Sequence, residues 1–130
     1  MQFLIKSTIE HPGQEAHQTQ QKVQGDWKEM KRSIYFRYSD EQQVETMIRM
    51  SEQDALITRK GAVTMRLPLE KGVLREGTYD TEGIKMALTV DTLQLNLFPD
   101  ERMMQFVYRL MNGEEWLGTY QLTIQQEEER

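Results

Sequence analysis

Apolar residues recur at every second position along most of this chain, and turn residues interrupt the alternation about every eight to twelve positions. The clearest runs are Phe3 to Ile9, Ile34 to Tyr38, Ile84 to Val90 and Met104 to Leu110. Because successive side chains of a β-strand point to opposite faces, this alternation indicates strands with one buried face and one solvated face. The pattern therefore predicts an all-β chain of about eight to ten short antiparallel strands.

A chain of 130 residues is long enough to bury one hydrophobic core without disulfide bonds or structural metals. Consecutive hairpins favour an up-and-down order of strands, and closure into a barrel removes edges that would pair with other chains. We therefore expect one domain over residues 1–130, a single antiparallel, mostly up-and-down barrel, with residues 125–130 as a frayed charged tail. A barrel of about eight strands is either filled by side chains or holds one small ligand.

Local signals give finer expectations. The polar stretch of residues 15–24 is predicted to be a strand, followed by a turn or bulge at Gly25–Trp27. A short helix is expected at Asp40–Gln43 or at Pro99–Met103. Asn112–Gly113 predicts the centre of a hairpin turn, because both residue types tolerate positive φ.

The hydrophobic alternation also changes phase by one position after Val90 and continues at Leu93, Leu95 and Leu97. A shift of one residue moves every later side chain to the opposite face of a strand. The sequence therefore predicts a bulge or a tight turn at Asp91–Thr92.

Composition limits the setting and the partners. The chain contains no cysteine, which excludes disulfide bonds, thiolate nucleophiles and cysteine-ligated metals, and we expect a reducing, cytoplasmic setting. No run approaches the roughly 18 apolar residues of a membrane-spanning helix, and residues 1–9 are typical of a strand rather than a signal peptide. A net charge of −5 repels phosphate backbones. We therefore expect no membrane segment and no DNA partner.

Two segments, Gly61-Ala62-Val63-Thr64-Met65 and Gly77-Thr78-Tyr79-Asp80-Thr81-Glu82-Gly83, resemble the YwiB-like family of small bacterial proteins of unknown function. The resemblance extends over nearly the whole chain in strand order and turn spacing. It implies a calycin-like, lipocalin-type β-barrel in the bacterial cytoplasm with room for a ligand cavity, and it implies no catalytic residue. The family pattern has proline where this chain has Glu82, whereas Gly83 is kept.

The polar segment of residues 15–24 is the main candidate for a binding site. If its odd positions point into the barrel, His17, Thr19 and Gln21 place polar groups inside. Buried polar groups must hydrogen-bond with one another, with water or with a ligand. The alternative is an exposed strand on the surface, and the sequence leaves open which face points inward.

Three tyrosines fall on faces that are predicted to point inward, where their hydroxyls would orient a ligand, bond to backbone carbonyls or lie at the rim: Tyr38, Tyr79 and Tyr120. Methionines on the same faces predict either a soft, adaptable lining or an ordinary core, since a thioether side chain suits both. These are Met50, Met65, Met86 and Met104.

No recognisable catalytic or phosphate-binding motif occurs in the sequence. Glu114 and Glu115 beside a turn, and Glu127–Glu129 in the tail, are typical of solvated charge rather than of a general acid and base. His11 and His17 have no obvious third metal ligand, and a haem held by one histidine stays an alternative. We therefore expect neither an enzyme nor a bound metal or cofactor.

Residues 28–37 interleave basic side chains with Tyr35 and Phe36, a composition able to stack on single-stranded RNA. Glu29 interrupts the basic run and Phe36 is expected in the core, so RNA is not the partner that we favour. The basic residues of the segment are Lys28, Lys31, Arg32 and Arg37.

These observations leave three functional hypotheses. The first is non-catalytic binding of a small, partly apolar or amphipathic molecule inside the barrel. The second is a module with a filled core that binds other proteins or forms a homodimer. RNA binding is the third. An open cavity of a few hundred cubic ångströms would support the first hypothesis, and a packed interior would contradict it.

Overall fold

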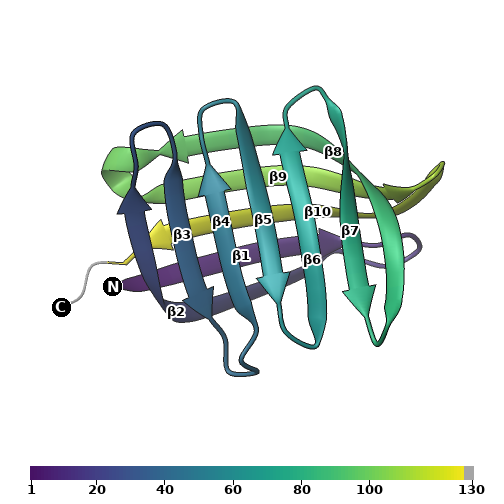
Figure 1. Ribbon diagram of the computed structural model, residues 1–130, viewed down its shortest axis with the longest axis horizontal. Helices are drawn as coiled ribbons and strands as arrows, with labels where there is room; N and C mark the ends of the chain where they lie inside the picture. Colours follow the sequence, from purple (N-terminus) through teal and green to yellow (C-terminus); the bar gives the residue numbers. More distant parts are fainter. Residues whose placement is uncertain (128–130) are drawn as a thin grey trace.

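The structure, a computed structural model, describes residues 1–127 and consists of ten strands and one short 3-10 helix. The elements are β1 (Gln2–Glu10), β2 (His17–Glu29), β3 (Ile34–Ser39), β4 (Glu45–Met50), β5 (Asp54–Lys60), β6 (Val63–Glu70), β7 (Leu74–Thr81), β8 (Ile84–Phe98), η1 (Pro99–Glu101), β9 (Met103–Asn112) and β10 (Glu115–Gln126). Each strand pairs antiparallel with the next, and β1 also pairs with β10. The predicted all-β, closed, up-and-down barrel is confirmed (Figure 1).

The barrel is flattened into two layers whose strands cross at a steep angle (Figure 1). The front layer contains β3 to β7, and the back layer contains β1, β9 and β10. β2 belongs to both layers, because residues 17–24 pair with β1 whereas residues 25–29 pair with β3. β8 changes layer in the same way at a register shift between Thr92 and Gln94. These two bent strands join the layers at opposite corners of the barrel.

β2 bends at Gly25 and continues in regular pairing with β3, which corrects the expectation of a turn or bulge at Gly25–Trp27. The strand continues to Glu29, and the turn follows at Met30, whose amide donates to the Ser33 carbonyl at 2.8 Å. A Cβ atom at position 25 would lie 2.6 Å from Cε1 of Phe36. The glycine is therefore required by close approach of a buried ring rather than by a turn. The bulge predicted from the phase change after Val90 is confirmed by the register shift in β8.

The hydrophobic core fills the space between the two layers. Phe3 and Phe36 pack edge to face with their ring centroids 4.7 Å apart, and Trp27 stacks on Phe3 at 6.1 Å. These positions lie on the faces that the alternation assigned to the interior. The side chains that are almost completely buried are Phe3, Phe36, Phe106, Ile48, Met50, Leu67, Leu69, Met104, Ile124 and Val90.

The turn between β9 and β10 differs from the expected one. Asn112 pairs with Glu115, so the two loop residues are Gly113 and Glu114 rather than Asn112 and Gly113. Only Gly113 has positive φ, at 63°. Glycine at the first loop position is the requirement of a type II′ turn, which explains why the hairpin uses Gly113 there.

Residues 40–43 form a turn instead of a helix. One carboxylate oxygen of Asp40 accepts hydrogen bonds from the amides of Gln42 and Val44, at 2.9 and 3.0 Å. Such local side-chain bonds compete with helix formation. The alternative position does hold the 3-10 helix η1. No helix within residues 1–127 has the length and apolar character needed to cross a membrane.

The C-terminal strand runs further than expected. Gln125 and Gln126 belong to β10 rather than to a frayed tail, and the amide of Gln126 donates to the Arg102 carbonyl at 3.1 Å. The amide of Glu127 donates to the Gln2 carbonyl at 2.9 Å. The remainder of the predicted tail, residues 128–130, lies outside the described residues.

The turn between β7 and β8 leads to a first prediction. Glu82 and Gly83 form its centre with φ of 51° and 79°, which is the backbone of a type I′ turn. Proline cannot adopt positive φ, so a relative with proline here must use another turn. Asparagine tolerates the left-handed region better than glutamate. We expect Glu82→Asn to raise the free energy of unfolding by about 0.5–1 kcal/mol, measured by urea denaturation.

Glu114→Asn is the matched control for Glu82→Asn. It makes the same chemical change in the β9–β10 turn at a residue without positive φ. We expect its stability to remain within about 0.5 kcal/mol of the parent protein. If both substitutions stabilise the protein equally, the cause is the loss of a negative charge. That result would contradict our explanation from the positive φ of Glu82.

Candidate functional site

The interior of the barrel contains a cavity of about 200 Å³. It lies toward the end of the barrel where β3 turns into β4 and β5 turns into β6, at the bottom of Figure 1. Both layers contribute apolar side chains to its walls, and β1 and β10 supply the back wall. The apolar wall residues are Ile5, Ile9, Ile48, Ile57, Leu122, Ile124 and Met65. The interior is thus packed at one end and hollow at the other.

A row of side chains crosses the front wall of this cavity from strand to strand. Tyr38 on β3 is paired with Thr46 on β4, and Thr46 is paired with Arg59 on β5. Directly opposed residues of antiparallel strands point to the same face. Thr46 is only 4% exposed, so the row points into the barrel. The β4–β5 pairing therefore places Thr46 and Arg59 side by side; the Thr46 hydroxyl is buried, whereas the Arg59 side chain is 41% exposed and extends from the cavity wall to solvent.

Tyr108 on β9 and Tyr120 on β10 line the same cavity from the back layer. Their rings stack with centroids 5.4 Å apart and planes inclined by 13°. Burial raises the pKa of the Tyr108 hydroxyl well above its usual range; neighbouring Tyr120 adds to the rise and Arg59 opposes it. Burial also raises the pKa of Tyr120, with a smaller contribution from Tyr79. Both phenols are therefore neutral at physiological pH and can donate hydrogen bonds.

Two polar atoms at the cavity are buried without a hydrogen-bond partner within residues 1–127. They are the hydroxyl oxygen of Thr46 and Nε of Arg59. The outer end of the same arginine forms an ion pair with Asp40, at 3.7 Å between Nη2 and Oδ2. Because buried polar atoms in proteins are nearly always hydrogen-bonded, this corner of the cavity can accept a polar group from a ligand or from water.

The structure brings three of the six sequence-predicted site residues together. Gln21, Tyr38 and Tyr120 all line the cavity. Tyr79 is opposite Met65 on β7, so it continues the row that contains Arg59. The binding role of these side chains stays a prediction.

The other two residues, His17 and Thr19, do not line the cavity. Gln21 is paired with buried Ile5, which places the odd positions of β2 on the inner side. His17 and Thr19 are nevertheless exposed, because among residues 1–127 this half of β2 pairs with β1 alone. The Thr19 hydroxyl hydrogen-bonds the hydroxyl of Ser7, which does line the cavity.

Sequence reasoning missed Thr46, Arg59 and Tyr108 as site residues. A usable signal was present, because Thr46 is in phase with Val44, Ile48 and other inward-facing residues of its strand. Arg59 likewise continues the inner face of Ile57. A polar side chain in phase with buried neighbours is therefore a candidate site residue, as the residues of a wholly polar strand are.

Of the two alternatives for the inward-facing methionines, a soft lining or an ordinary core, the structure mostly shows core. Only Met65 lines the cavity, whereas Met50 and Met104 are almost completely buried away from it. His11 uses its Nδ1 atom to hydrogen-bond the Leu117 carbonyl at 3.1 Å. Within the described part of the chain, no three His, Cys, Asp or Glu side chains are grouped as metal ligands would be.

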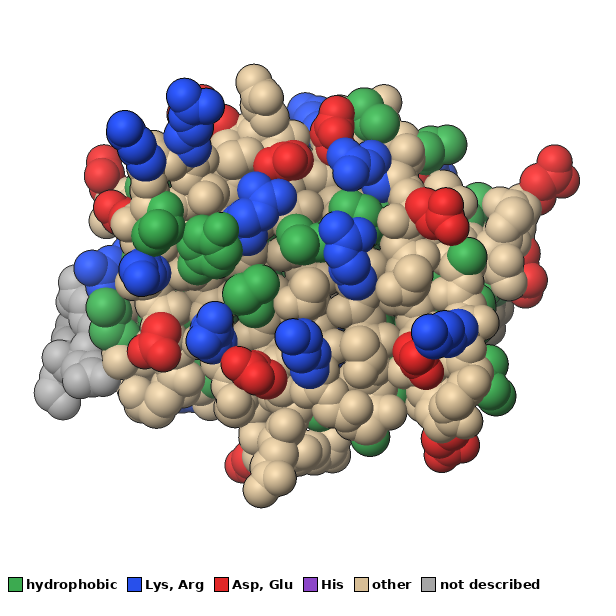
Figure 2. All heavy atoms as spheres, in the orientation of Figure 1, with side chains coloured by type: hydrophobic (Ala, Val, Ile, Leu, Met, Phe, Trp, Pro, Cys, Tyr) green, Lys and Arg blue, Asp and Glu red, His purple; other side chains and the backbone are tan. Residues whose placement is uncertain are grey.

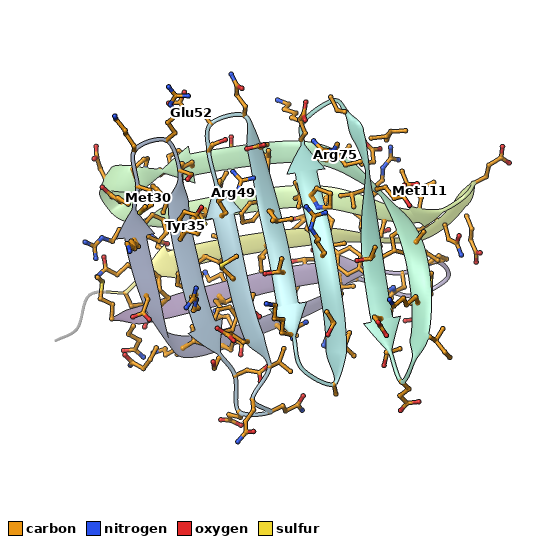
Figure 3. All side chains as sticks on the ribbon, in the orientation of Figure 1. Met30, Tyr35, Arg49, Glu52, Arg75 and Met111 are labelled. Carbon is orange, nitrogen blue, oxygen red and sulfur yellow. The ribbon has the colours of Figure 1, made fainter. Side chains whose placement is uncertain are left out.

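The basic segment of residues 28–37 lies partly on the outer face of the front layer. Phe36 is fully buried, which leaves Tyr35 as its one aromatic side chain outside the core. Tyr35 lies beside Arg49 on the neighbouring strand (Figure 3). Acidic side chains are interspersed with basic ones on this face (Figure 2), and Arg37 forms an ion pair with Glu45 at 3.8 Å. RNA binding stays a prediction.

The fold and the cavity define a class of protein: a closed, ten-stranded, antiparallel barrel with a small, partly polar interior site. Residues 4–124 match the family described as a domain of unknown function (DUF1934), and the chain belongs to this family.

Among solved structures, the chain is similar to the crystal structure of ywiB protein from Bacillus subtilis. The two share 21% sequence identity with a TM-score of 0.74, over 98% of this chain and 91% of the other. At this identity the similarity shows the fold alone. It confirms the resemblance that the sequence suggested. No curated protein matches the chain.

Proposed function

We propose that the barrel binds a small, partly apolar molecule and catalyses no reaction on it. The observation that carries the proposal is the cavity of about 200 Å³, in which apolar walls surround the unpartnered atoms of Thr46 and Arg59. Leaving such buried atoms unsatisfied costs free energy, which a ligand with one polar end would recover. A cavity of about 150 Å³ holds benzene, so this one suits a ligand of about eight non-hydrogen atoms.

Native mass spectrometry of the protein purified gently from cells, without detergent, is the first test. We expect a reproducible extra mass that is lost on denaturation, because a ligand in the barrel would survive mild purification. The difference in mass would also identify the ligand class. An apo mass, together with a negative result in the binding experiment below, would contradict the proposal.

Isoleucine methyl groups offer a direct binding measurement with hexanamide, a neutral probe of about eight non-hydrogen atoms. Five isoleucines line the cavity, whereas Ile34 and Ile84 lie elsewhere and act as internal controls. We expect hexanamide to shift the methyl NMR signals of the cavity set while leaving the two controls in place. Equal shifts in both sets would indicate non-specific binding. The cavity set is Ile5, Ile9, Ile48, Ile57 and Ile124.

A second candidate function, self-association, is favoured by the free edge of β2. Residues 17–24 pair with β1 on one side, whereas pairing with β3 begins only at Gly25. An unpaired edge presents backbone amides and carbonyls to another strand, and two identical edges can pair antiparallel about a two-fold axis. The native mass spectrum reports this as well. A homodimer would support self-association, and a monomer at every concentration would contradict it.

A further inference from the structure

Arg59 is the one charged residue among the described residues that line the cavity. The remaining lining consists of aliphatic side chains, methionine, hydroxyls and glutamine amides. No carboxylate within residues 1–127 shares this lining with the guanidinium. The Arg59 side chain is 41% exposed, so water solvates part of the guanidinium. A ligand that displaces this water binds better if it carries a negative charge that compensates the cation.

The nearest acidic partner, Asp40, compensates this charge only in part. The ion pair is 3.7 Å long, which exceeds the range of about 2.7–3.2 Å for a hydrogen bond from nitrogen to oxygen. The Asp40 carboxylate is held in place because its other oxygen accepts the amides of Gln42 and Val44. It would have to break this turn to approach Arg59 more closely. The guanidinium therefore keeps donors, including buried Nε, for another acceptor.

Hydroxyl groups lie around the same position. Thr46 is directly opposite Arg59, and its buried hydroxyl has no partner within residues 1–127. The neutral phenol of Tyr108 is close enough for Arg59 to influence its ionisation. Neutral hydroxyls can donate to an anion that a guanidinium already binds, and together they would replace the water around a carboxylate.

We propose that the ligand is a small amphipathic carboxylate, whose charged group binds Arg59 and Thr46 while its aliphatic tail occupies the isoleucine-lined part of the cavity. This inference rests on the proposed function and adds the ligand class to it. Asp40 then acts as an internal competitor for the arginine. A guanidinium fork binds a carboxylate through two parallel hydrogen bonds, and the aliphatic walls suit the tail of such a ligand.

The test compares hexanoate with hexanamide at pH 7, where the two probes have the same size but differ in charge. Binding is measured by the isoleucine methyl shifts described above. We expect hexanoate to bind about tenfold more tightly than hexanamide, as charge-assisted hydrogen bonds are the stronger kind. In Arg59→Gln this preference should disappear, while hexanamide affinity changes by less than about twofold.

Two further variants make the result specific. Arg37→Gln removes the same charge from the outer face of the front layer and should keep the preference for hexanoate. Asp40→Asn retains an oxygen for the turn but removes the competing charge, so hexanoate should bind several-fold more tightly. Thermal unfolding of each variant verifies that it is folded before binding is compared.

The outcomes separate the two proposals. If neither probe moves the cavity methyl signals, the proposed function itself is wrong. If hexanamide binds as tightly as hexanoate, or if Arg59→Gln keeps the preference, the barrel binds ligands but the assignment of an anion to Arg59 is wrong. If both Arg59→Gln and Arg37→Gln lose the preference for hexanoate, the preference depends only on the net charge of the protein. That result would also overturn the assignment of an anion to Arg59.

Discussion

Gly25→Ala is expected to destabilise the protein by about 3 kcal/mol, the upper end of the usual effect of overpacking a core. The added Cβ atom would lie 2.6 Å from Cε1 and 2.9 Å from Cζ of Phe36, and 3.2 Å from Cδ2 of Phe3. Both rings are 0% exposed and pack against each other, so neither can move without disturbing the core. Urea denaturation monitored by circular dichroism measures the change.

Two companion variants show whether the clash is the cause. Gln24→Ala places the same methyl group on the adjacent, exposed position of β2 and should change stability by less than about 0.5 kcal/mol. Phe36→Leu in the Gly25→Ala background should recover part of the loss, because contacting residues couple in a double-mutant cycle. Additive losses in the double variant would contradict a clash with Phe36.

Tyr108 makes the stability of the protein sensitive to alkaline pH. Its pKa is raised in the folded state, so the folded protein keeps the phenolic proton after the unfolded chain has lost it near pH 10. The unfolded state then binds fewer protons, and the free energy of unfolding falls as pH rises. The contribution from Tyr108 is fully present below pH 10 and falls by about 1.4 kcal/mol for each pH unit above it.

Urea denaturation at pH 9, 10, 11 and 12 tests this prediction with Tyr108→Phe. The stability of the parent protein should fall relative to this variant by about 2.3 kcal/mol between pH 10 and 12, because the unfolded phenol is already half ionised at pH 10. Tyr35→Phe, on the outer face of β3, is the control and should follow the parent protein. Parallel curves for the parent and Tyr108→Phe would show that the buried phenol does not resist ionisation.

The position of the cavity follows from the way in which β2 closes the barrel. Its second half pairs with β3 and covers the corner where Phe3, Trp27 and Phe36 pack. Within the described part of the chain its first half pairs with β1 alone, which leaves the interior beside Gln21 without a second neighbouring strand. The same bend thus produces a packed end and a hollow end. The candidate ligand site and the free strand edge both result from the bend in β2.

Much of the fold was predictable because strand periodicity is a local property. Alternation placed Phe3, Phe36 and Phe106 on inner faces, and the phase change after Val90 located the bulge in β8. Turn details were less predictable. Asn112 and Gly113 both suit a left-handed backbone, and only the register of β9 with β10 shows that the loop begins at Gly113.

The residues of the candidate site were likewise predictable only in part. The sequence offered Gln21, Tyr38 and Tyr120 as candidates for the interior while leaving other positions for them open, and all three line the cavity. It did not single out Arg59: the residue is in phase with inward-facing Ile57, but phase alone does not show whether an arginine at a strand end lines a cavity or lies in solvent. His17 has the inner phase but remains exposed, since burial depends on a neighbouring strand that is missing at this position.

The sequence by itself determined the all-β class, the order of antiparallel strands and the inward phase of the clearly alternating ones, because these depend on side-chain alternation and on turn residues close together in the chain. It left open the phase of residues 15–24. The tertiary structure decided where the layers bend, which end of the barrel is filled and which polar groups meet. These features depend on contacts between distant residues, such as Gly25 with Phe36 and Arg59 with Asp40. Only the closed barrel brings such pairs together.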